Sequence, residues 1–311
     1  MSRVVGVASG RAAAAAVLAA AVLWGTVGAA QELGAATAQP FTVAAVRTVG
    51  AAVALVAVLL IARRGRDLVL VVRTGRGAAL ASGVAIAVFQ VGLLTGVREA
   101  GVALGTLLAI GSAPAWAGTF AVVAGRRPGV RWMVATMLTV AGAGVLLLFG
   151  TQGGDGQGVV TPSPVGIVSS LVAGAAYAAY ATASKRVLAA GATGPAMVAV
   201  VFIVAALVLS PLLFVGDIGW VATPTGGTTA VWLTVATVGG YLLSARGLRW
   251  LDAPTVTTLT LAEPLTATGL ALVAVGERLT GAGAVGAALL LAGLTLVSGR
   301  SAPNTVGARG A

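Results

Sequence analysis

Residues 257–275 read "TTLTLAEPLTATGLALVAV", an apolar run long enough to cross a membrane with an acidic residue, Glu263, in its middle. A membrane-spanning helix needs about 20 predominantly apolar residues. A carboxylate inside such a span costs roughly 2.5–3.5 kcal/mol on insertion scales, and residues of this kind usually face a bundle interior or a water-filled cavity. The meaning of Glu263 therefore depends on what the rest of the chain builds around it.

Composition predicts an integral membrane protein. Of the 311 residues, 9% are charged and 58% are hydrophobic, and the mean hydropathy is +1.02. A soluble domain carries roughly 25% charged residues, so a soluble fold of this size could not cover its surface. The sequence has no cysteine and no histidine, which excludes disulfides, thiol nucleophiles and imidazole-based sites, and it has no G-x-x-x-x-G-K-[ST] phosphate-binding motif. We expect no cofactor and no metal.

The hydropathy pattern predicts an all-α polytopic protein with ten membrane spans joined by short connections rich in Gly, Pro and Thr. The predicted spans are 12–30, 41–62, 77–96, 102–124, 132–150, 165–184, 196–215, 229–245, 254–275 and 281–299.

The first span has an alternative interpretation as a cleaved signal peptide. It follows Arg3 and Arg11 and ends in the small residues "GAA" before Gln31. Its apolar stretch of 19 residues is longer than the usual core of a signal peptide. We therefore expect it to remain as a membrane helix.

The basic residues predict the orientation in the membrane. If the N-terminus is cytoplasmic, 16 of the 19 Lys and Arg residues fall on that side and two, Arg98 and Arg278, on the other. Arg47 falls inside the second span. This bias follows the positive-inside rule and predicts a plasma-membrane protein with both termini in the cytoplasm. It also explains the net charge of +11 without nucleic acid, which we exclude as a partner.

The chain contains an internal repeat. "APAWAGTFAVVAGRRPGVRWMVATMLTVAGAGVLLL" in the first half aligns with "EPLTATGLALVAVGERLTGAGAVGAALLLAGLTLVS" in the second. The aligned pairs are Pro114 with Pro264, Arg127 with Arg278 and Gly142 with Gly293. Chance similarity between helices rich in Ala, Gly and Leu is the alternative. The repeat predicts a first unit at 1–150, a linker at 151–163, a second unit at 164–300 and a cytoplasmic tail at 301–311.

A repeat of five helices must be inverted, because an odd number of spans brings the second copy into the membrane from the opposite face. The connections agree with this. The segment between spans two and three has five arginines, and its copy "GDIGWVATPTGG" has none. Inverted repeats around a site at the membrane midplane are typical of alternating-access transporters.

These features together resemble the EamA-type branch of the drug/metabolite transporter superfamily. The resemblance rests on the two five-helix halves, "LWGT" in span one, the arginine in span two and the "EP…GE" segment of the second half. It implies export or exchange of small metabolites, such as amino acids, their derivatives or amines. It also implies a central cavity lined mainly by helices one to four and six to nine.

Glu263 lies close to the midplane of span nine, with Thr260 on the same helix face and Pro264 directly behind it. Because proline has no N–H, we expect it to leave the carbonyl of Thr260 free. A carboxyl, a hydroxyl and a carbonyl would then converge as a site for a cation, an ammonium group or a proton. The alternative is a protonated Glu263 that only ties helix nine to a neighbour.

Arg47 also has competing interpretations. Its long side chain can reach the interface or pair with Glu32 at the end of span one. It can instead anchor a substrate carboxylate or pair with Glu263. If Arg47 and Glu263 both face the cavity, they would suit a zwitterion such as an amino acid.

Other candidates are polar or aromatic residues within the spans. The candidate substrate-binding residues are Trp24, Gln90, Tyr177, Tyr180 and Tyr241. Aromatic rings can pack or anchor a helix at the interface, and they can also contact an amine. Pro114, Pro211 and Pro264 are expected to bend helices four, seven and nine.

The sequence therefore predicts a secondary transporter of small molecules that is not an enzyme and has possible proton coupling. A membrane enzyme acting on lipid-linked substrates is the alternative, but it would need clustered acids or histidines, and the eight acidic residues are scattered. A sensor or scaffold would usually add a soluble domain, and no connection is long enough for one. Besides a small-molecule substrate and the lipid bilayer, a homodimer partner is left open.

Overall fold

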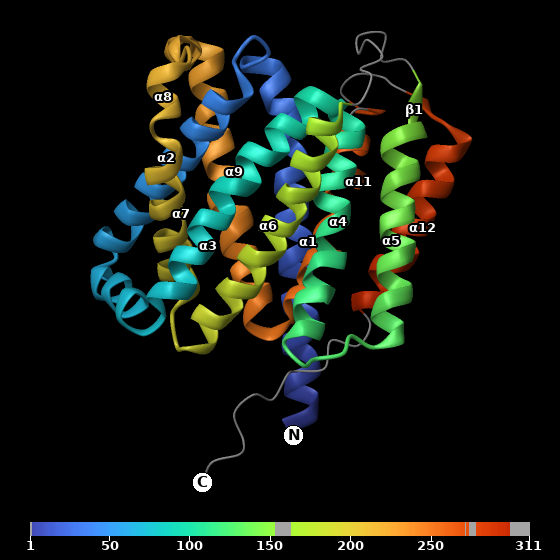
Figure 1. The fold of residues 1–311 in the computed structure, drawn as a ribbon, viewed down its shortest axis with the longest axis horizontal. Helices are drawn as coiled ribbons and strands as arrows, with labels where there is room; N and C mark the ends of the chain where they lie inside the picture. Colours follow the sequence, from blue (N-terminus) through green and yellow to red (C-terminus); the bar gives the residue numbers. More distant parts are fainter. Residues whose placement is uncertain (1, 153–162, 271, 274–277, 299–311) are drawn as a thin grey trace.

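The computed structural model describes residues 2–152, 163–270, 272–273 and 278–298, and they form a bundle of long helices (Figure 1). Residues 153–162 of the predicted linker, the end of the ninth predicted span and the predicted tail at 301–311 lie outside the described residues.

Nine helices in the described part are long and apolar enough to cross a membrane. The helices of the first half are α1 (Ser2–Gly34), α2 (Pro40–Ile61), α3 (Gly65–Ala100), α4 (Val102–Val123) and α5 (Val130–Phe149). Those of the second half are α6 (Pro164–Ala189), α7 (Gly194–Leu209), α9 (Pro224–Trp250) and α12 (Gly281–Ser298). The short helix α8 (Leu212–Val215) continues α7, and the two together make the apolar span Gly194–Val215. The 3₁₀ helix η1 (Gly219–Ala222) then leads to α9.

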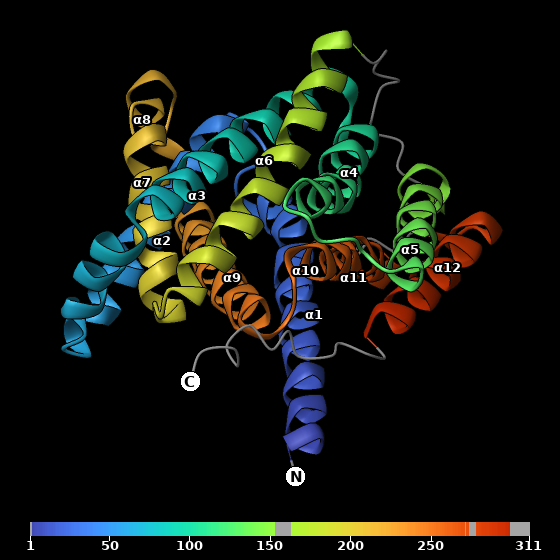
Figure 2. The ribbon, with the colours of Figure 1, turned by 60° about the horizontal axis from the view of Figure 1, so that its bottom comes forward.

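The ninth predicted span is not one continuous α-helix. It consists of α10 (Ala253–Leu259), the 3₁₀ turn η2 (Thr260–Ala262) and α11 (Glu263–Leu270), which follow one another beside α1 (Figure 2). Together with the nine long helices this segment completes the ten-span, all-α architecture. The described strands, β1 (Thr151–Gln152) and β2 (Arg278–Leu279), form a two-residue antiparallel pair at the ends of α5 and α12.

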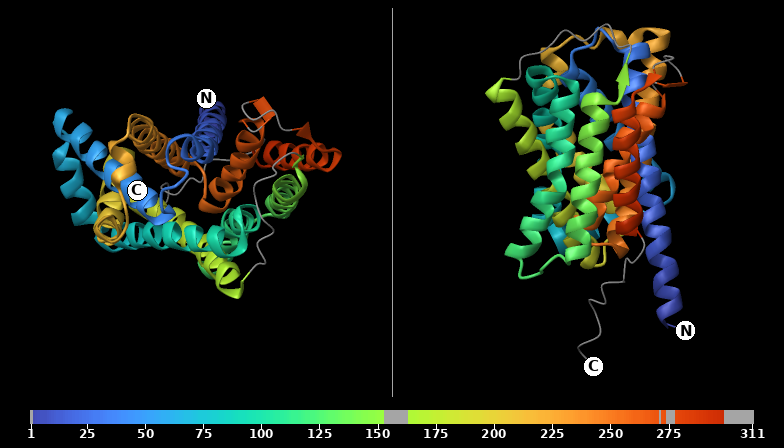
Figure 3. Two further views of the ribbon diagram at one scale, coloured as in Figure 1. Left: turned by 90° about the horizontal axis from the view of Figure 1, so that it is seen from above. Right: turned by 90° about the vertical axis from the view of Figure 1, so that its right-hand side faces the viewer.

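The interior is built by helices from both halves. α3 packs along α6 and α7, α1 packs along α9 and α11, and α5 pairs with α12. Seen from above, α5 and α12 lie together at one edge of the bundle, and the end of α2 and the start of α3 lie at the opposite edge (Figure 3). α1 is an integral part of this packing, since Val17, Ala20 and Ala21 are completely buried.

Small residues let the helices approach closely. A Cβ added at Gly92 of α3 would lie 2.8 Å from the carbonyl oxygen of Ser169 on α6, and one added at Gly286 of α12 would lie 2.8 Å from the backbone nitrogen of Leu146 on α5. In lipid, where burial of apolar surface gives no driving force between helices, such close packing is a main source of association.

The halves are inverted, as predicted. α1 begins at the end of the bundle marked N in Figure 1, whereas α6 begins at the other end, where the backbone N–H of Ser163 donates to the carbonyl of Glu99 at 2.9 Å. α12 ends on the same side as α1 begins (Figure 3).

One expected loop is largely helical. The arginine-rich segment at 63–76 was predicted to connect spans two and three, but α3 begins at Gly65 and contains a kink at Gly75 (φ −142°, ψ 24°). Repeated apolar residues between the arginines let this segment pack one face against the bundle, and that tertiary packing favours helix over loop.

Candidate functional site

A cavity of about 370 Å³ opens between the two halves of the bundle. It extends from the connection between α1 and α2, at Ala35, Ala36 and Ala38, inward to Tyr241, Thr260 and Glu263. Its mouth therefore lies at the end opposite the start of α1. The cavity volume is in the range of small-molecule sites.

The lining comes from α1, α2, α3, α4, α6, α9, η2 and α11. Among the described residues, α5, α7 and α12 contribute none of it. The sequence resemblance implied lining by helices six to nine, so α7 departs from that expectation. Its packing against α2 and α3, on the outer side of the ring, accounts for the difference.

Arg47 lines the cavity from α2, and its side chain is fixed by α3. Nη2 of Arg47 donates a hydrogen bond to Oε1 of Gln90 at 2.5 Å, and Nε2 of Gln90 donates a longer one to Oγ1 of Thr48 at 3.5 Å. Gln90 itself is completely enclosed behind Arg47. Nε of Arg47 is buried without a partner among the described residues, so a donor of the guanidinium is still available.

Glu263 lines the cavity from the break in the ninth span. It is the first residue of α11, directly after the 3₁₀ turn η2, and Pro264 follows it. α1 passes close by, since a Cβ added at Gly25 would lie 2.9 Å from the carbonyl oxygen of Glu263. The broken helix and the close approach of α1 hold this carboxyl at the inner end of the cavity.

The carbonyl of Thr260 is not free, contrary to the prediction. The backbone N–H of Glu263 donates to it across the 3₁₀ turn, so the tighter turn replaces the hydrogen bond that Pro264 cannot make. The hydroxyl of Thr260 donates to the carbonyl of Thr257 at 2.9 Å, which leaves only its acceptor lone pairs for the cavity.

Arg47 and Glu263 form no ion pair with each other, and Arg47 forms none with Glu32. Within the described ranges, the salt bridge that occurs is between the neighbours Arg98 and Glu99. Two of the interpretations of Arg47 are therefore wrong for this conformation. Both Arg47 and Glu263 line the cavity, and neither is neutralised by an ion pair with the other.

Four aromatic residues chosen from the sequence form one cluster, and three of them line the cavity. Trp24 and Tyr241 meet edge to face, with ring centroids 5.1 Å apart, and Tyr180 and Tyr241 do so at 5.4 Å. Tyr177 lies 5.7 Å from Tyr180. Trp24, Tyr177 and Tyr241 line the cavity, whereas Tyr180 is buried behind them. The hydroxyls of Tyr177 and Tyr180 have no hydrogen-bond partner within the described residues.

The three candidate prolines have different surroundings. Pro114 lies within α4, which stays helical throughout, so it does not interrupt that helix. Pro211 lies at the junction of α7 and α8, and Pro264 lies at the break before α11. Their role in motion stays a prediction.

Sequence reasoning missed several lining residues. Phe89 lines the cavity and contacts Tyr177 with ring centroids 5.2 Å apart, whereas Phe202 of α7 is buried behind the lining and contacts Tyr241 at 4.8 Å. Thr106 and Thr237 line the cavity as well. Phe and Thr are common in packed membrane helices, and their spacing gave no sign of these positions.

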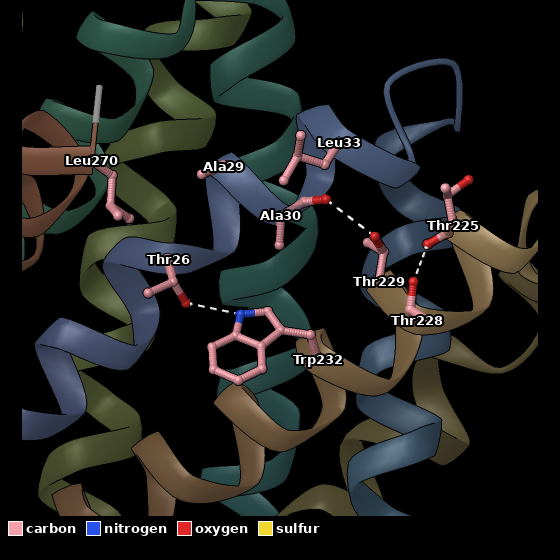
Figure 4. A pocket seen from close by; sticks show the side chains of 9 residues that line it. All are labelled: Thr26, Ala29, Ala30, Leu33, Thr225, Thr228, Thr229, Trp232 and Leu270. Atoms are coloured by element: carbon pink, nitrogen blue, oxygen red, sulfur yellow. Dashed lines mark hydrogen bonds between the residues drawn. The ribbon is translucent and has the colours of Figure 1, made fainter. Parts of the chain in front are cut away.

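A second hollow, of about 530 Å³, lies between α1, α9 and Leu270 at the side of the bundle (Figure 4). Nε1 of Trp232 donates to Oγ1 of Thr26 at 3.1 Å there, and Oγ1 of Thr229 donates to the carbonyl of Ala30 at 3.3 Å. None of its lining residues is charged. The cavity with Arg47 and Glu263 is therefore the better candidate for a site that recognises polar molecules.

Comparisons with known proteins agree with this architecture. The EamA-like transporter family matches residues 11–148 and again residues 164–299. YwfM of Bacillus subtilis (strain 168), an uncharacterized transporter, is 38% identical over 287 residues, which cover 91% of this chain and 92% of that protein. A solved crystal structure with 20% identity is similar over 91% of this chain and 95% of its own, with a TM-score of 0.76, and supports the fold. The two family matches cover both halves of the bundle, and the chain belongs to the EamA-like transporter family.

Proposed function

We propose that this chain is a secondary transporter that exports or exchanges small metabolites bearing both an amino group and a carboxylate, such as amino acids and their derivatives. The observation that supports it is the presence of Arg47 and Glu263 in one cavity without an ion pair between them. A guanidinium binds a carboxylate through charge-assisted hydrogen bonds, and a carboxylate binds an ammonium group in the same way.

The aromatic lining supports the same class of substrate. Trp24 of α1 and Tyr241 of α9 line the same cavity as the two charged residues, and their rings meet edge to face. An ammonium group over such a ring gains cation–π attraction. Ala, Val and Leu residues also line the cavity and suit a small substrate with a modest apolar side chain, and a second carboxylate, Glu32, lines it from the end of α1.

We further propose alternating access with proton coupling through Glu263. The cavity reaches one end of the bundle, and the positive-inside rule assigns that end to the outside of the cell. This conformation would then be the outward-open state, with both termini in the cytoplasm. A partly buried carboxyl that binds either a proton or the substrate's ammonium group couples the two by competition.

Transport by purified protein in proteoliposomes tests the proposal. Amino acids, amines and carboxylic acids of matched size would be compared, with and without an imposed pH gradient, for the wild type and Glu263→Gln. Glu99→Gln is the matched control, because Glu99 lies outside the cavity and an amide can still accept from Ser163.

The expected result is transport of the zwitterions above the single-charge analogues, with a gradient response that Glu263→Gln abolishes and Glu99→Gln retains. Equal transport of amines and zwitterions would show that the protein does not recognise a carboxylate on its substrate, and that part of the proposal would fall. An unchanged gradient response in Glu263→Gln would show that Glu263 is not the coupling group.

A further inference from the structure

The kinked start of α3 forms a basic surface at the edge of the bundle. We name residues 63–76 the basic elbow. It begins just after α2 ends at Ile61, turns sharply at Arg63 (φ 54°), continues as the first turns of α3 and ends around the kink at Gly75. Figures 1 and 2 show these turns beside the end of α2, at the edge of the molecule.

One face of the basic elbow is docked on the bundle. Val71 is completely buried and Leu68 packs against the main core. The hydroxyl of Thr193, at the start of α7, donates to Oδ2 of Asp67 at 3.3 Å. A Cβ added at Gly75 would contact Val187 of α6 at 3.6 Å. These contacts fix the orientation of the elbow, so its other face points away from the protein.

The outward face mixes arginine with apolar side chains. Val69, Leu70 and Val72 are 51%, 43% and 50% exposed. The arginines of the elbow are all exposed, and they are Arg63, Arg64, Arg66, Arg73 and Arg76. Helices with apolar residues beside arginines lie in the membrane interface, with the apolar groups at the boundary between headgroups and acyl chains.

The charge of this face is not compensated by the protein. The elbow has five arginines and one acidic residue, Asp67, so its net charge is +4 (5 − 1). Asp67 faces Thr193, and no arginine of the elbow takes part in an ion pair within the described residues. A phosphodiester provides the anionic oxygens that a guanidinium binds in a bidentate manner.

We propose that the basic elbow is a binding site for anionic phospholipid headgroups, with Val69, Leu70 and Val72 inserted below the phosphates. Clusters of arginine beside a membrane helix attract anionic lipids at short range. The lipid would thereby hold the connection between α2, which carries Arg47, and α3, which carries Gln90. The proposal does not depend on the substrate or on the transport mechanism.

The test measures lipid binding to the full chain in detergent. Fluorescent phosphatidylglycerol and phosphatidylcholine are the probes for the wild type and for the variant R63Q/R64Q/R66Q/R73Q. The matched control is R126Q/R127Q/R246Q/R249Q, which removes the same charge from exposed positions between α4 and α5 and in the last turns of α9. The positive-inside rule assigns these positions to the same side as the elbow. Melting temperatures without added lipid establish that each variant is folded.

We expect the wild type and the control to prefer phosphatidylglycerol. The elbow variant should lose roughly tenfold or more in apparent affinity for it, and salt should weaken binding in the wild type. Equal losses of affinity in the two variants would show that phosphatidylglycerol is attracted to the whole basic side of the protein, and this would overturn the proposed site at the elbow. No preference for phosphatidylglycerol in the wild type would also overturn it. If the elbow variant does not fold, V69S/L70S/V72S, which retains the charge, must weaken binding for the proposal to stand.

Discussion

Nη2 of Arg47 donates to Oε1 of Gln90 at 2.5 Å, so the positive charge of the cavity is held by a neutral amide. An acidic partner would have neutralised the guanidinium before any substrate arrived. Gln90 instead fixes its direction and leaves its charge for a bound anion. This arrangement makes Gln90 a positioning residue for Arg47. Substitutions at position 90 can therefore separate two roles of Gln90: leaving the charge of Arg47 uncompensated, and fixing the direction of its guanidinium.

Gln90→Glu should weaken binding of carboxylate-bearing substrates more than Gln90→Leu does. The glutamate would pair with Arg47 and compete with the substrate, whereas leucine removes one hydrogen bond and retains the charge. Loss of a charge-assisted hydrogen bond worth about 1.5–3 kcal/mol corresponds to a roughly 10–150-fold higher KM. Transport kinetics in proteoliposomes measure this. Equal effects of the two substitutions would mean that Gln90 acts on position alone.

Tyr177→Phe and Tyr180→Phe should differ in function although they lie one turn apart on α6. Both hydroxyls lack a partner among the described residues, but only Tyr177 lines the cavity. We expect Tyr177→Phe to raise KM about fivefold, as for one lost hydrogen bond of about 1 kcal/mol.

Tyr180→Phe should leave transport unchanged, because it removes a buried hydroxyl that has no partner in the described residues and retains the ring beside Tyr241. The same KM assay, with the melting temperature of each variant, checks the pair. A higher KM in Tyr180→Phe would contradict the separation of lining from packing.

Gly25→Ala should destabilise the bundle, whereas Gly28→Ala should not. A Cβ at Gly25 would lie 2.6 Å from Cβ of Thr266, so α1 would be displaced from α11 and from Glu263. At Gly28, one turn further along α1, an added Cβ meets nothing within 4 Å. Both substitutions gain similar helix propensity, so their difference isolates the clash.

Overpacking of this kind costs about 1–3 kcal/mol. The melting temperatures of the two variants in the same detergent measure the difference. If Gly25→Ala melts with or above Gly28→Ala, the contact between α1 and α11 is looser than the structure has it.

The sequence was sufficient for the architecture because lipid constrains it strongly. A span must be long and apolar, so the spans followed from the hydropathy pattern. The arginines must favour one side, so the inverted halves followed from residues 63–76, which carry five arginines, and from their copy, which carries none. Glu263 and Arg47 were recognisable as candidates because charge inside a span is costly.

The pairing of these residues could not be predicted in the same way. Membrane helices are apolar all round, so periodicity does not show which face of α2 is turned to Gln90 or which face of α6 is turned to the cavity. The 3₁₀ turn at Thr260 was missed because a proline's missing N–H can be compensated in several ways, and tertiary contacts with α1 choose among them. The helical start of α3 was missed because its stabilising partner, the turn between α6 and α7, is distant in sequence.

Lys185 should keep the end of the bundle opposite the cavity mouth closed. Its Nζ donates to the carbonyls of Leu248 at 2.7 Å and Leu251 at 2.9 Å, at the C-terminal end of α9. These bonds satisfy carbonyls that a helix end leaves unpaired, and they tie α6 to α9 on that side. Lys185→Met would retain the apolar stem but lose all the donors, so the two helices should separate more often.

Ser244 provides a reporter for this separation. It is completely buried on α9, one turn before Leu248, and the chain has no cysteine, so Ser244→Cys gives a single thiol without background. We expect a maleimide to label that thiol slowly in the otherwise wild-type protein and about tenfold faster with Lys185→Met. A tenfold change corresponds to about 1.4 kcal/mol less free energy favouring the closed arrangement of α6 and α9. Lys185→Arg should retain the slow rate, since arginine still donates to the carbonyls. If labelling with Lys185→Met stays slow, Lys185 caps α9 without controlling access to the inner side.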